Sequence, residues 1–192
     1  MNTDQLTWTL LKSEYLHNDT WFKARKDTCR KPDGKIVDPY YVMEYPTWAA
    51  AVAITEDDKV VLVKQYRHAI QQTIIELPGG CIDDTDNAIE DGIRRELLEE
   101  TGYAFNDITY LGKTSPNPST NSNYLHMYLL KGGVKVQEQE LDHNEEIEVL
   151  LVPLNELVKM LQTNSFIQAM HVTTIFYALQ ALGTLHLRST GL

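Results

Sequence analysis

Apolar residues follow two spacings along this chain, and the two spacings predict different elements. Continuous or alternating apolar runs are typical of strands, whereas a repeat every three to four positions is typical of helices. We expect strands at residues 48–55, 59–66, 109–113, 124–131 and 147–152, and helices at residues 87–101, 154–162 and 167–182. This order predicts an α/β protein with a mixed sheet between helical layers.

The regions outside these elements differ in character. Residues 1–45 contain short alternating stretches, two of which are joined by the turn Pro32-Asp33-Gly34 as in a hairpin. We therefore expect an N-terminal β-rich segment, 1–45, and one main domain, 46–187, with frayed residues from 188 onward. The loop 114–123 is rich in Pro, Asn and Ser and lacks a core pattern, which is typical of a binding loop.

The predicted helix at 87–101 carries clustered carboxylates. Glu96, Glu99 and Glu100 lie at positions i, i+3 and i+4, so a helix places all three on one face. Like charges at this spacing repel by roughly a few tenths of a kcal/mol per pair. A hard divalent cation such as Mg²⁺ takes carboxylate oxygens and would turn this repulsion into a binding site. On spacing alone, a solvated acidic face is the alternative.

The same helix has recognisable ends. Asn87 followed by Glu90 is typical of an N-cap with its reciprocal partner. Gly102 suits the left-handed position that ends a helix. Gly92 is unfavourable in a helix interior, so we expect it to serve close packing against another element.

The segment from Gly80 to Tyr103 resembles a known signature. Gly80, Arg95-Glu96-Leu97, Glu99-Glu100 and Gly102-Tyr103 are similar to the pattern G-x5-E-x7-R-E-U-x-E-E-x-G-U of the Nudix hydrolases, in which U is aliphatic. Two departures are visible: the loop after the glycine is one residue longer, and Asn87 replaces the first Glu. Asp86, Glu90 or Asp91 is expected to take over the contact of that Glu with Arg95.

The resemblance covers roughly residues 40–160 and favours one branch of the family. Residues 60–67, ending in Gln-Tyr-Arg, resemble a strand of the ADP-ribose pyrophosphatases, as does the stretch Ile-Glu-Leu-Pro-Gly-Gly at 75–80. Pro118 falls near a proline that this branch associates with its substrates. The resemblance implies an α/β/α sandwich and a Mg²⁺- or Mn²⁺-dependent pyrophosphohydrolase. Its substrate would be a nucleoside diphosphate linked to another moiety, with ADP-ribose or a related nucleotide sugar first.

Individual roles follow from this resemblance. The metal would be held by oxygens of Gly79, Glu96, Glu99 and Glu100. Arg95 would orient these ligands, and Glu99 and Glu100 would also serve catalysis. Substrate contacts are expected at Arg67, Glu76 and Pro118, although a surface ion pair is the alternative for Arg67. The family places a further Glu before a late strand as ligand or general base, which makes Glu145 and Glu146 the candidates, with His126 and His143 as alternatives.

Composition limits the partners. A net charge of −10 argues against nucleic acid, because binding of the phosphate backbone needs a basic surface. The longest apolar run, 48–54, is far too short to span a bilayer, and the first residues do not form a signal peptide. Cys29 and Cys81 form neither a disulfide scaffold nor a zinc pattern, so we expect a reducing cytoplasm, with Cys81 as a small packing residue.

The N-terminal segment predicts an oligomer. Aromatic residues at this density outside a core motif are typical of an interface, and we expect a homodimer in which this segment reaches the partner's substrate site. The residues concerned include Trp8, Trp21, Phe22, Tyr40 and Tyr41. Two other functions stay open: a non-catalytic nucleotide-sugar sensor with the same fold, and a hydrolase that removes unwanted nucleoside triphosphates.

Overall fold

The computed structural model describes residues 3–185, which divide into two compact units. The N-terminal unit comprises residues up to Pro46 together with 115–123. The main unit comprises residues 47–114 and the chain from Tyr124 onward. The two units are therefore described separately.

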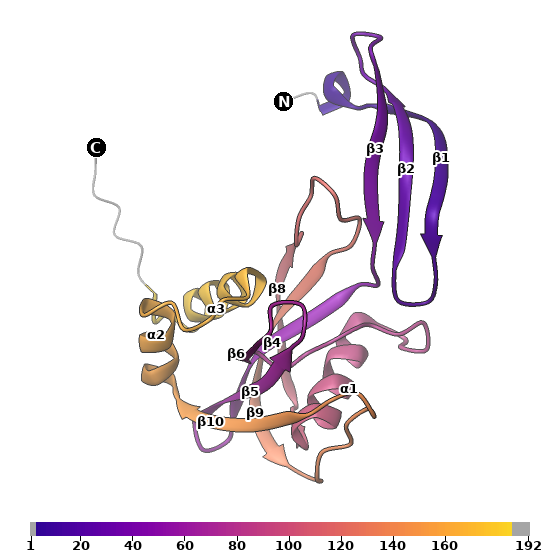
Figure 1. Ribbon diagram of the computed structural model, residues 1–192. Helices are drawn as coiled ribbons and strands as arrows, with labels where there is room; N and C mark the ends of the chain where they lie inside the picture. Colours follow the sequence, from indigo (N-terminus) through magenta and orange to yellow (C-terminus); the bar gives the residue numbers. More distant parts are fainter. Residues whose placement is uncertain (1–2, 186–192) are drawn as a thin grey trace, which may run out of the picture. The chain divides into compact units, whose positions relative to one another are not determined.

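A seven-stranded mixed sheet forms the centre of the main unit (Figure 1). Its order is β10-β5-β4-β9-β7, with β6 added to β5 and β8 added to β9. Strands β4 and β9 run parallel and the other pairs run antiparallel, so the predicted mixed sheet is confirmed. The strands are β4 (Trp48–Thr55), β5 (Lys59–Arg67), β6 (Gln72–Glu76), β7 (Tyr103–Ala104), β8 (Asp107–Thr114), β9 (Leu125–Lys135) and β10 (Ile147–Pro153).

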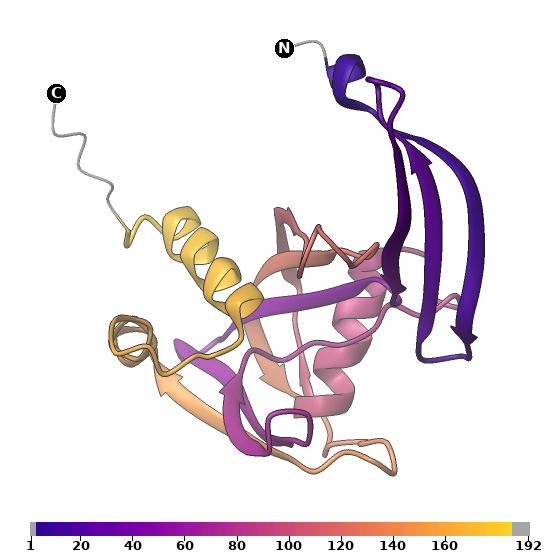
Figure 2. The same cartoon turned by 45° about the horizontal axis from the view of Figure 1, so that its top comes forward.

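Helices cover both faces of this sheet, because β4 is apolar on both sides. Ala49 and Ala51 face the layer of α1 (Ile89–Thr101), where Ile93 and Leu97 pack. The alternate β4 residues, including Val52, face α2 (Leu154–Gln162) and α3 (Ala169–Ala181). Figure 2 shows α1 and α3 on opposite sides of the sheet. The predicted α/β/α sandwich is therefore confirmed.

The N-terminal unit contains a three-stranded antiparallel sheet, after a short 3₁₀ helix at Thr3–Leu6. Its strands are β1 (Thr9–Asn18), β2 (Lys23–Arg30) and β3 (Ile36–Glu44). The predicted hairpin turn joins β2 to β3, and Gly34 adopts the left-handed region there with φ +83°. Every residue of β1 is exposed, so this sheet has little core of its own.

The loop between β8 and β9 belongs to the N-terminal unit. The Met43 N–H donates to the Thr120 carbonyl (2.8 Å), and the Ser122 N–H donates to the Met43 carbonyl (3.1 Å). The Tyr40 hydroxyl donates to the Ser119 carbonyl (2.7 Å). The segment predicted to be a binding loop is therefore held in shape by β3, through backbone pairing that its sequence did not indicate.

Several boundaries differ from the predictions. Helix α1 begins at Ile89, and its N-cap residue is Ala88, without a side-chain cap. The predicted cap at Asn87 is therefore wrong, because a turn closed by Asp86 precedes the helix: its carboxylate accepts the Asp83 N–H (2.9 Å). Strands β6 and β7 were not predicted, and α3 is shorter than predicted at both ends. The residues predicted to fray, from 188 onward, lie outside the described part of the chain.

Within residues 3–185, no helix combines the length and apolarity that crossing a membrane requires.

Candidate active site

A glycine turn between β6 and α1 forms one wall of the site. The Ala49 and Ala51 N–H groups of β4 donate to the carbonyls of Gly80 (2.9 Å) and Pro78 (3.2 Å). A Cβ on Gly79, whose φ is +142°, would lie 2.2 Å from the Ala49 carbonyl oxygen. A Cβ on Gly80 would lie 2.4 Å from a carboxylate oxygen of Glu96. Gly79 therefore lets the backbone approach β4, and Gly80 leaves room for the Glu96 carboxylate.

Helix α1 forms the opposite wall. The Gly79 N–H donates to Oε2 of Glu100 (2.8 Å), and Glu100 is only 5% exposed. Glu96, one turn earlier, reaches Gly80, whereas Glu99 is more exposed and turns toward Arg95. The structure thus brings Glu96 and Glu100 together against the glycine turn and leaves Glu99 at the rim.

The two inner carboxylates are electrostatically unfavourable as anions. Burial, together with the charges of Glu99 and Glu145, raises the pKa of Glu96 to about 7. Burial, together with the charges of Glu96 and Glu145, raises the pKa of Glu100 to about 8. A site that crowds buried carboxylates in this way favours an added positive charge.

Arg95 supplies part of that charge. Its guanidinium donates to Asp86 (3.0 and 3.2 Å), to Glu96 (3.0 Å) and to Glu99 (2.9 Å). Of the three residues considered as a replacement for the missing family Glu, Asp86 makes this contact. Asp91 is exposed and does not pair with Arg95. Gly92 lets the helix approach Asp86, because a Cβ there would lie 2.7 Å from the Asp86 carboxylate.

Arg67 and Glu76 form an ion pair beside the acidic cluster. Nε of Arg67 donates to Oε2 of Glu76 (2.7 Å), whose side chain is buried, while Arg67 is half-exposed. The positive charge of Arg67 lowers the pKa of Glu100, whereas burial raises it. Arg67 therefore lies within electrostatic range of the cluster. Glu76 therefore fixes one side of the Arg67 guanidinium.

The candidates for a general base lie in different surroundings. Glu145 is half-buried, accepts the Asp142 N–H (3.2 Å), and is close enough for its charge to act on both inner carboxylates. Glu146 and His143 are exposed. His126 lies on β9 against Tyr110, with 3.2 Å between the Tyr110 hydroxyl and Nδ1.

Pro118, predicted as a substrate contact, belongs to the N-terminal unit.

The donor set fits a hard divalent cation. Glu96, Glu100 and the backbone of the glycine turn offer oxygen atoms only, which Mg²⁺ and Mn²⁺ prefer. Within residues 3–185, no group of three His, Cys, Asp or Glu side chains already stands at the spacing of a coordination sphere. Arg95 engages two of the candidate ligands, Glu96 and Glu99.

Cys81 follows the glycine turn and is half-buried. Burial and the nearby Glu96 raise the pKa of its thiol, which makes the reactive thiolate rare. This agrees with a packing role for the side chain.

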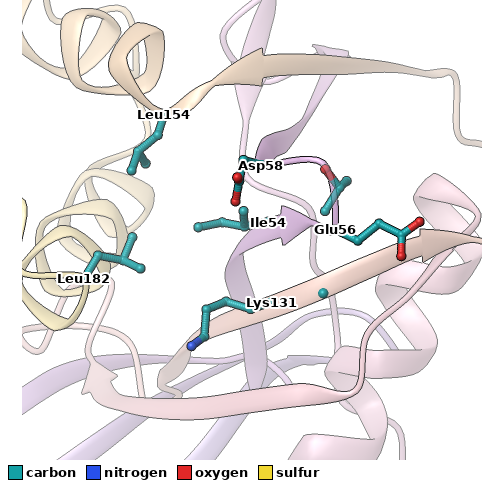
Figure 3. A pocket seen from close by; sticks show the side chains of 8 residues that line it. Ile54, Glu56, Asp58, Lys131, Leu154 and Leu182 are labelled. Carbon is teal, nitrogen blue, oxygen red and sulfur yellow. The ribbon is translucent and has the colours of Figure 1, made fainter.

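A separate cavity of about 370 Å³ lies at the other end of β4 (Figure 3). Leu154 and Leu182 point into it from the side of α2 and α3, and Lys131 lies opposite. None of the predicted site residues lines this cavity, which is bounded by Ile54, Thr55, Glu56, Asp58, Lys131, Gly132, Leu154 and Leu182. This cavity and the acidic cluster are therefore different features.

One buried residue of this region was not singled out from the sequence. The Nδ1 of His171, on α3, accepts the N–H of Leu77, the residue before Pro78 at the start of the glycine turn (3.2 Å). A single His in an apolar helical pattern carries no signal of such a contact, because the two residues are 94 positions apart.

The fold is an α/β/α sandwich, and its helix α1 carries clustered carboxylates against the glycine turn. The chain matches two family models: NUDIX domain over residues 45–170, and nucleoside diphosphate sugar hydrolase N-terminal domain over residues 8–43. The chain therefore belongs to the NUDIX family, and it is a Nudix hydrolase.

Relatives and solved structures agree with this assignment. The chain is 30% identical to an ADP-ribose pyrophosphatase of Bacillus subtilis, over 76% of this chain and 78% of the relative. It is 26% identical to a methanol dehydrogenase activator of Bacillus methanolicus, over 87% of this chain and 90% of the relative. A crystal structure of an ADP compounds hydrolase matches the fold with a TM-score of 0.79 at 23% identity, covering 93% of this chain and 97% of that one.

Proposed function

We propose that this protein is a Mg²⁺- or Mn²⁺-dependent pyrophosphohydrolase that cleaves a nucleoside diphosphate linked to another moiety. ADP-ribose or a related nucleotide sugar is the first candidate substrate. The observation that carries the proposal is the pair of buried carboxylates, Glu96 and Glu100, held against the glycine turn with pKa values raised to about 7 and about 8. The name of the Bacillus subtilis relative and the N-terminal domain match support the substrate class.

Each residue of the site would have its own role in the reaction. A bound divalent cation would polarise the phosphoryl oxygens and lower the pKa of the attacking water. Glu96 and Glu100 would hold it, with Glu99 and the Gly79 carbonyl as further candidate ligands, and Arg95 would orient Glu96 and Glu99. Glu145 accepts the proton of the water as it attacks phosphorus in line.

Substrate binding involves a second set of side chains. Arg67 donates hydrogen bonds to a phosphate from the guanidinium N–H groups that Glu76 does not engage. Pro118, in the loop 115–123, stays a predicted substrate contact on the strength of the family resemblance alone. With ADP-ribose as substrate, the products are AMP and ribose 5-phosphate.

The test is a substrate panel with and without metal. We expect purified protein to hydrolyse ADP-ribose, GDP-mannose, a related nucleotide sugar or a dinucleotide in Mg²⁺ or Mn²⁺. This activity should be lost in EDTA and should recover when metal is added back. Products are separated by chromatography, so that cleavage of the diphosphate is distinguished from release of terminal phosphate. Equal turnover in EDTA contradicts the metal role.

The same panel separates the alternatives. A sensor binds a nucleotide sugar, measured by calorimetry, and turns over none of the compounds. A triphosphate-cleaving enzyme hydrolyses nucleoside triphosphates at a higher kcat/KM than any nucleotide sugar.

We further propose a cytoplasmic homodimer that contacts its partner through the N-terminal sheet. Trp21 and Tyr41 of the N-terminal unit are 74% and 55% exposed. Apolar exposure of this kind is typical of an interface. Two free cysteines, Cys29 and Cys81, agree with a reducing compartment. An aromatic residue of the N-terminal sheet would stack on the base of the partner's substrate.

Light scattering is expected to give about twice the 22.0 kDa chain mass. The double variant Trp21→Ala with Tyr41→Ala should shift the protein toward a monomer and raise KM. Deletion of residues 1–40 should abolish both the dimer and substrate binding. Tyr177→Ala on α3, 42% exposed in the main unit, is the matched control and should leave mass and KM unchanged. A wild-type monomer with full activity contradicts the proposal.

A further inference from the structure

The glycine turn is held by hydrogen bonds from three different elements. Strand β4 donates to its carbonyls at Pro78 and Gly80, and α1 accepts its Gly79 N–H through Glu100. Pro78 has no N–H, so the remaining donor at the start of the turn is Leu77. Leu77 is 1% exposed, and its N–H therefore needs a partner inside the protein.

That partner is His171 of α3. The Leu77 N–H donates to Nδ1 of His171 at 3.2 Å, and His171 is 7% exposed. An imidazole that accepts at Nδ1 carries its proton on Nε2 and is neutral. Burial lowers the pKa of His171 to about 3, and the charge of Arg67 acts in the same direction, so the neutral form is maintained.

The surroundings of His171 exclude an ion pair as its main role. Oε1 of Glu76 lies 4.0 Å from Nδ1, beyond hydrogen-bond distance, and Glu76 instead accepts from Arg67 at 2.7 Å. The other buried polar side chain of this helix, Thr174, donates its hydroxyl to the Met170 carbonyl (2.9 Å). The backbone of the turn is thus the partner that Nδ1 serves.

We propose that His171 is a positioning residue, which fixes the Leu77–Gly80 turn so that the Gly79 backbone faces Glu96 and Glu100 in the geometry that metal binding requires. The inference rests on the proposed function for its metal site. Residues that orient metal ligands from outside the coordination sphere typically change metal affinity or activity by about 10- to 100-fold when replaced. We expect a change of that size here, because the turn would lose its anchor to α3.

The experiment uses the full chain and three variants. His171→Leu keeps an apolar side chain of similar size but removes the acceptor. His171→Asn places an amide oxygen near the position of Nδ1 and restores it. Thr174→Val removes a buried hydrogen bond from the same helix without touching the turn, and serves as the matched control for general destabilisation. Thermal melting confirms that each variant is folded before it is compared.

Affinity for Mn²⁺ is measured without substrate, from the electron paramagnetic resonance signal of the free ion. His171→Leu is expected to raise the apparent Kd by about 10- to 100-fold. His171→Asn and Thr174→Val should stay near wild type. Equal affinity in His171→Leu and wild type overturns the inference. Equal weakening in His171→Leu, His171→Asn and Thr174→Val also overturns it, because the effect would then be structural only.

Exchange of the Leu77 amide, followed by nuclear magnetic resonance, is independent of metal and substrate. It should accelerate in His171→Leu and recover in His171→Asn. A wild-type protein that binds no Mn²⁺ overturns the proposed metal site and the metal part of this inference. Unchanged Leu77 exchange in His171→Leu overturns the hydrogen bond itself while leaving the proposed function intact.

Discussion

Glu100→Gln is expected to lower kcat by about 10²- to 10³-fold while the protein stays folded, since metal-based charge stabilisation is worth several kcal/mol. Glu100 is the most deeply buried carboxylate of the acidic cluster, and it accepts the Gly79 N–H at 2.8 Å. An amide oxygen can still accept this bond, so the change removes one ligand charge and little else.

The rate is measured at saturating Mg²⁺ with the best substrate of the panel. Glu138→Gln is the matched control, because the Glu138 side chain is 90% exposed and pairs with Lys135 at the surface. It should leave kcat within about twofold, since an exposed ion pair contributes little. A Glu100→Gln variant with the rate of the control would remove Glu100 from the list of ligands.

The same variant makes a prediction for stability in EDTA. The folded-state pKa of Glu100, about 8, lies above the ordinary glutamate pKa of 4.5. The folded protein therefore binds this proton more tightly, and the associated stability is present below about pH 4.5 and lost as the pH rises through about 8. Glu100→Gln has no such titration. Its melting temperature should exceed that of wild type by more at about pH 8 than at about pH 5.

The sequence was sufficient for elements whose pattern is complete within a single segment. Strand β4 and helix α2 have the predicted bounds, because an uninterrupted apolar run and an amphipathic repeat are local signals. Gly102 ends α1 in the left-handed region, with φ +77°, as predicted. These features fixed the order of strands and helices, and with it the layered fold.

Non-local contacts were beyond the sequence patterns. Strand β6 is short and half-exposed, and it exists because β5 offers an edge for pairing. The loop 115–123 takes its shape from β3, and His171 reaches Leu77 across 94 residues. The spacing of the acidic residues located the candidate site, but the burial that raises the pKa of Glu96 and Glu100 depends on packing against the glycine turn. The roles assigned to these residues stay predictions until variants are measured.

The sequence left Glu145 and Glu146 as equal candidates for the base, and the structure distinguishes their surroundings. Burial is the largest cause of the raised pKa of Glu96 and of Glu100, and the charge of Glu145 is a smaller cause for both. Glu146 is exposed and contributes to neither. A general base must stand within reach of the water it deprotonates, and a metal held by Glu96 and Glu100 would bring that water beside these carboxylates.

We therefore expect Glu145→Gln to lower kcat by about 10²- to 10⁴-fold, the range of a positioned base, and to change KM little. Glu146→Gln, the neighbouring residue with the same chemistry, should keep kcat within about twofold, because a solvated charge contributes almost nothing. If both variants keep the wild-type rate, the base lies elsewhere; if Glu146→Gln alone loses it, the loop places Glu146 in the site during catalysis and the assignment to Glu145 is wrong.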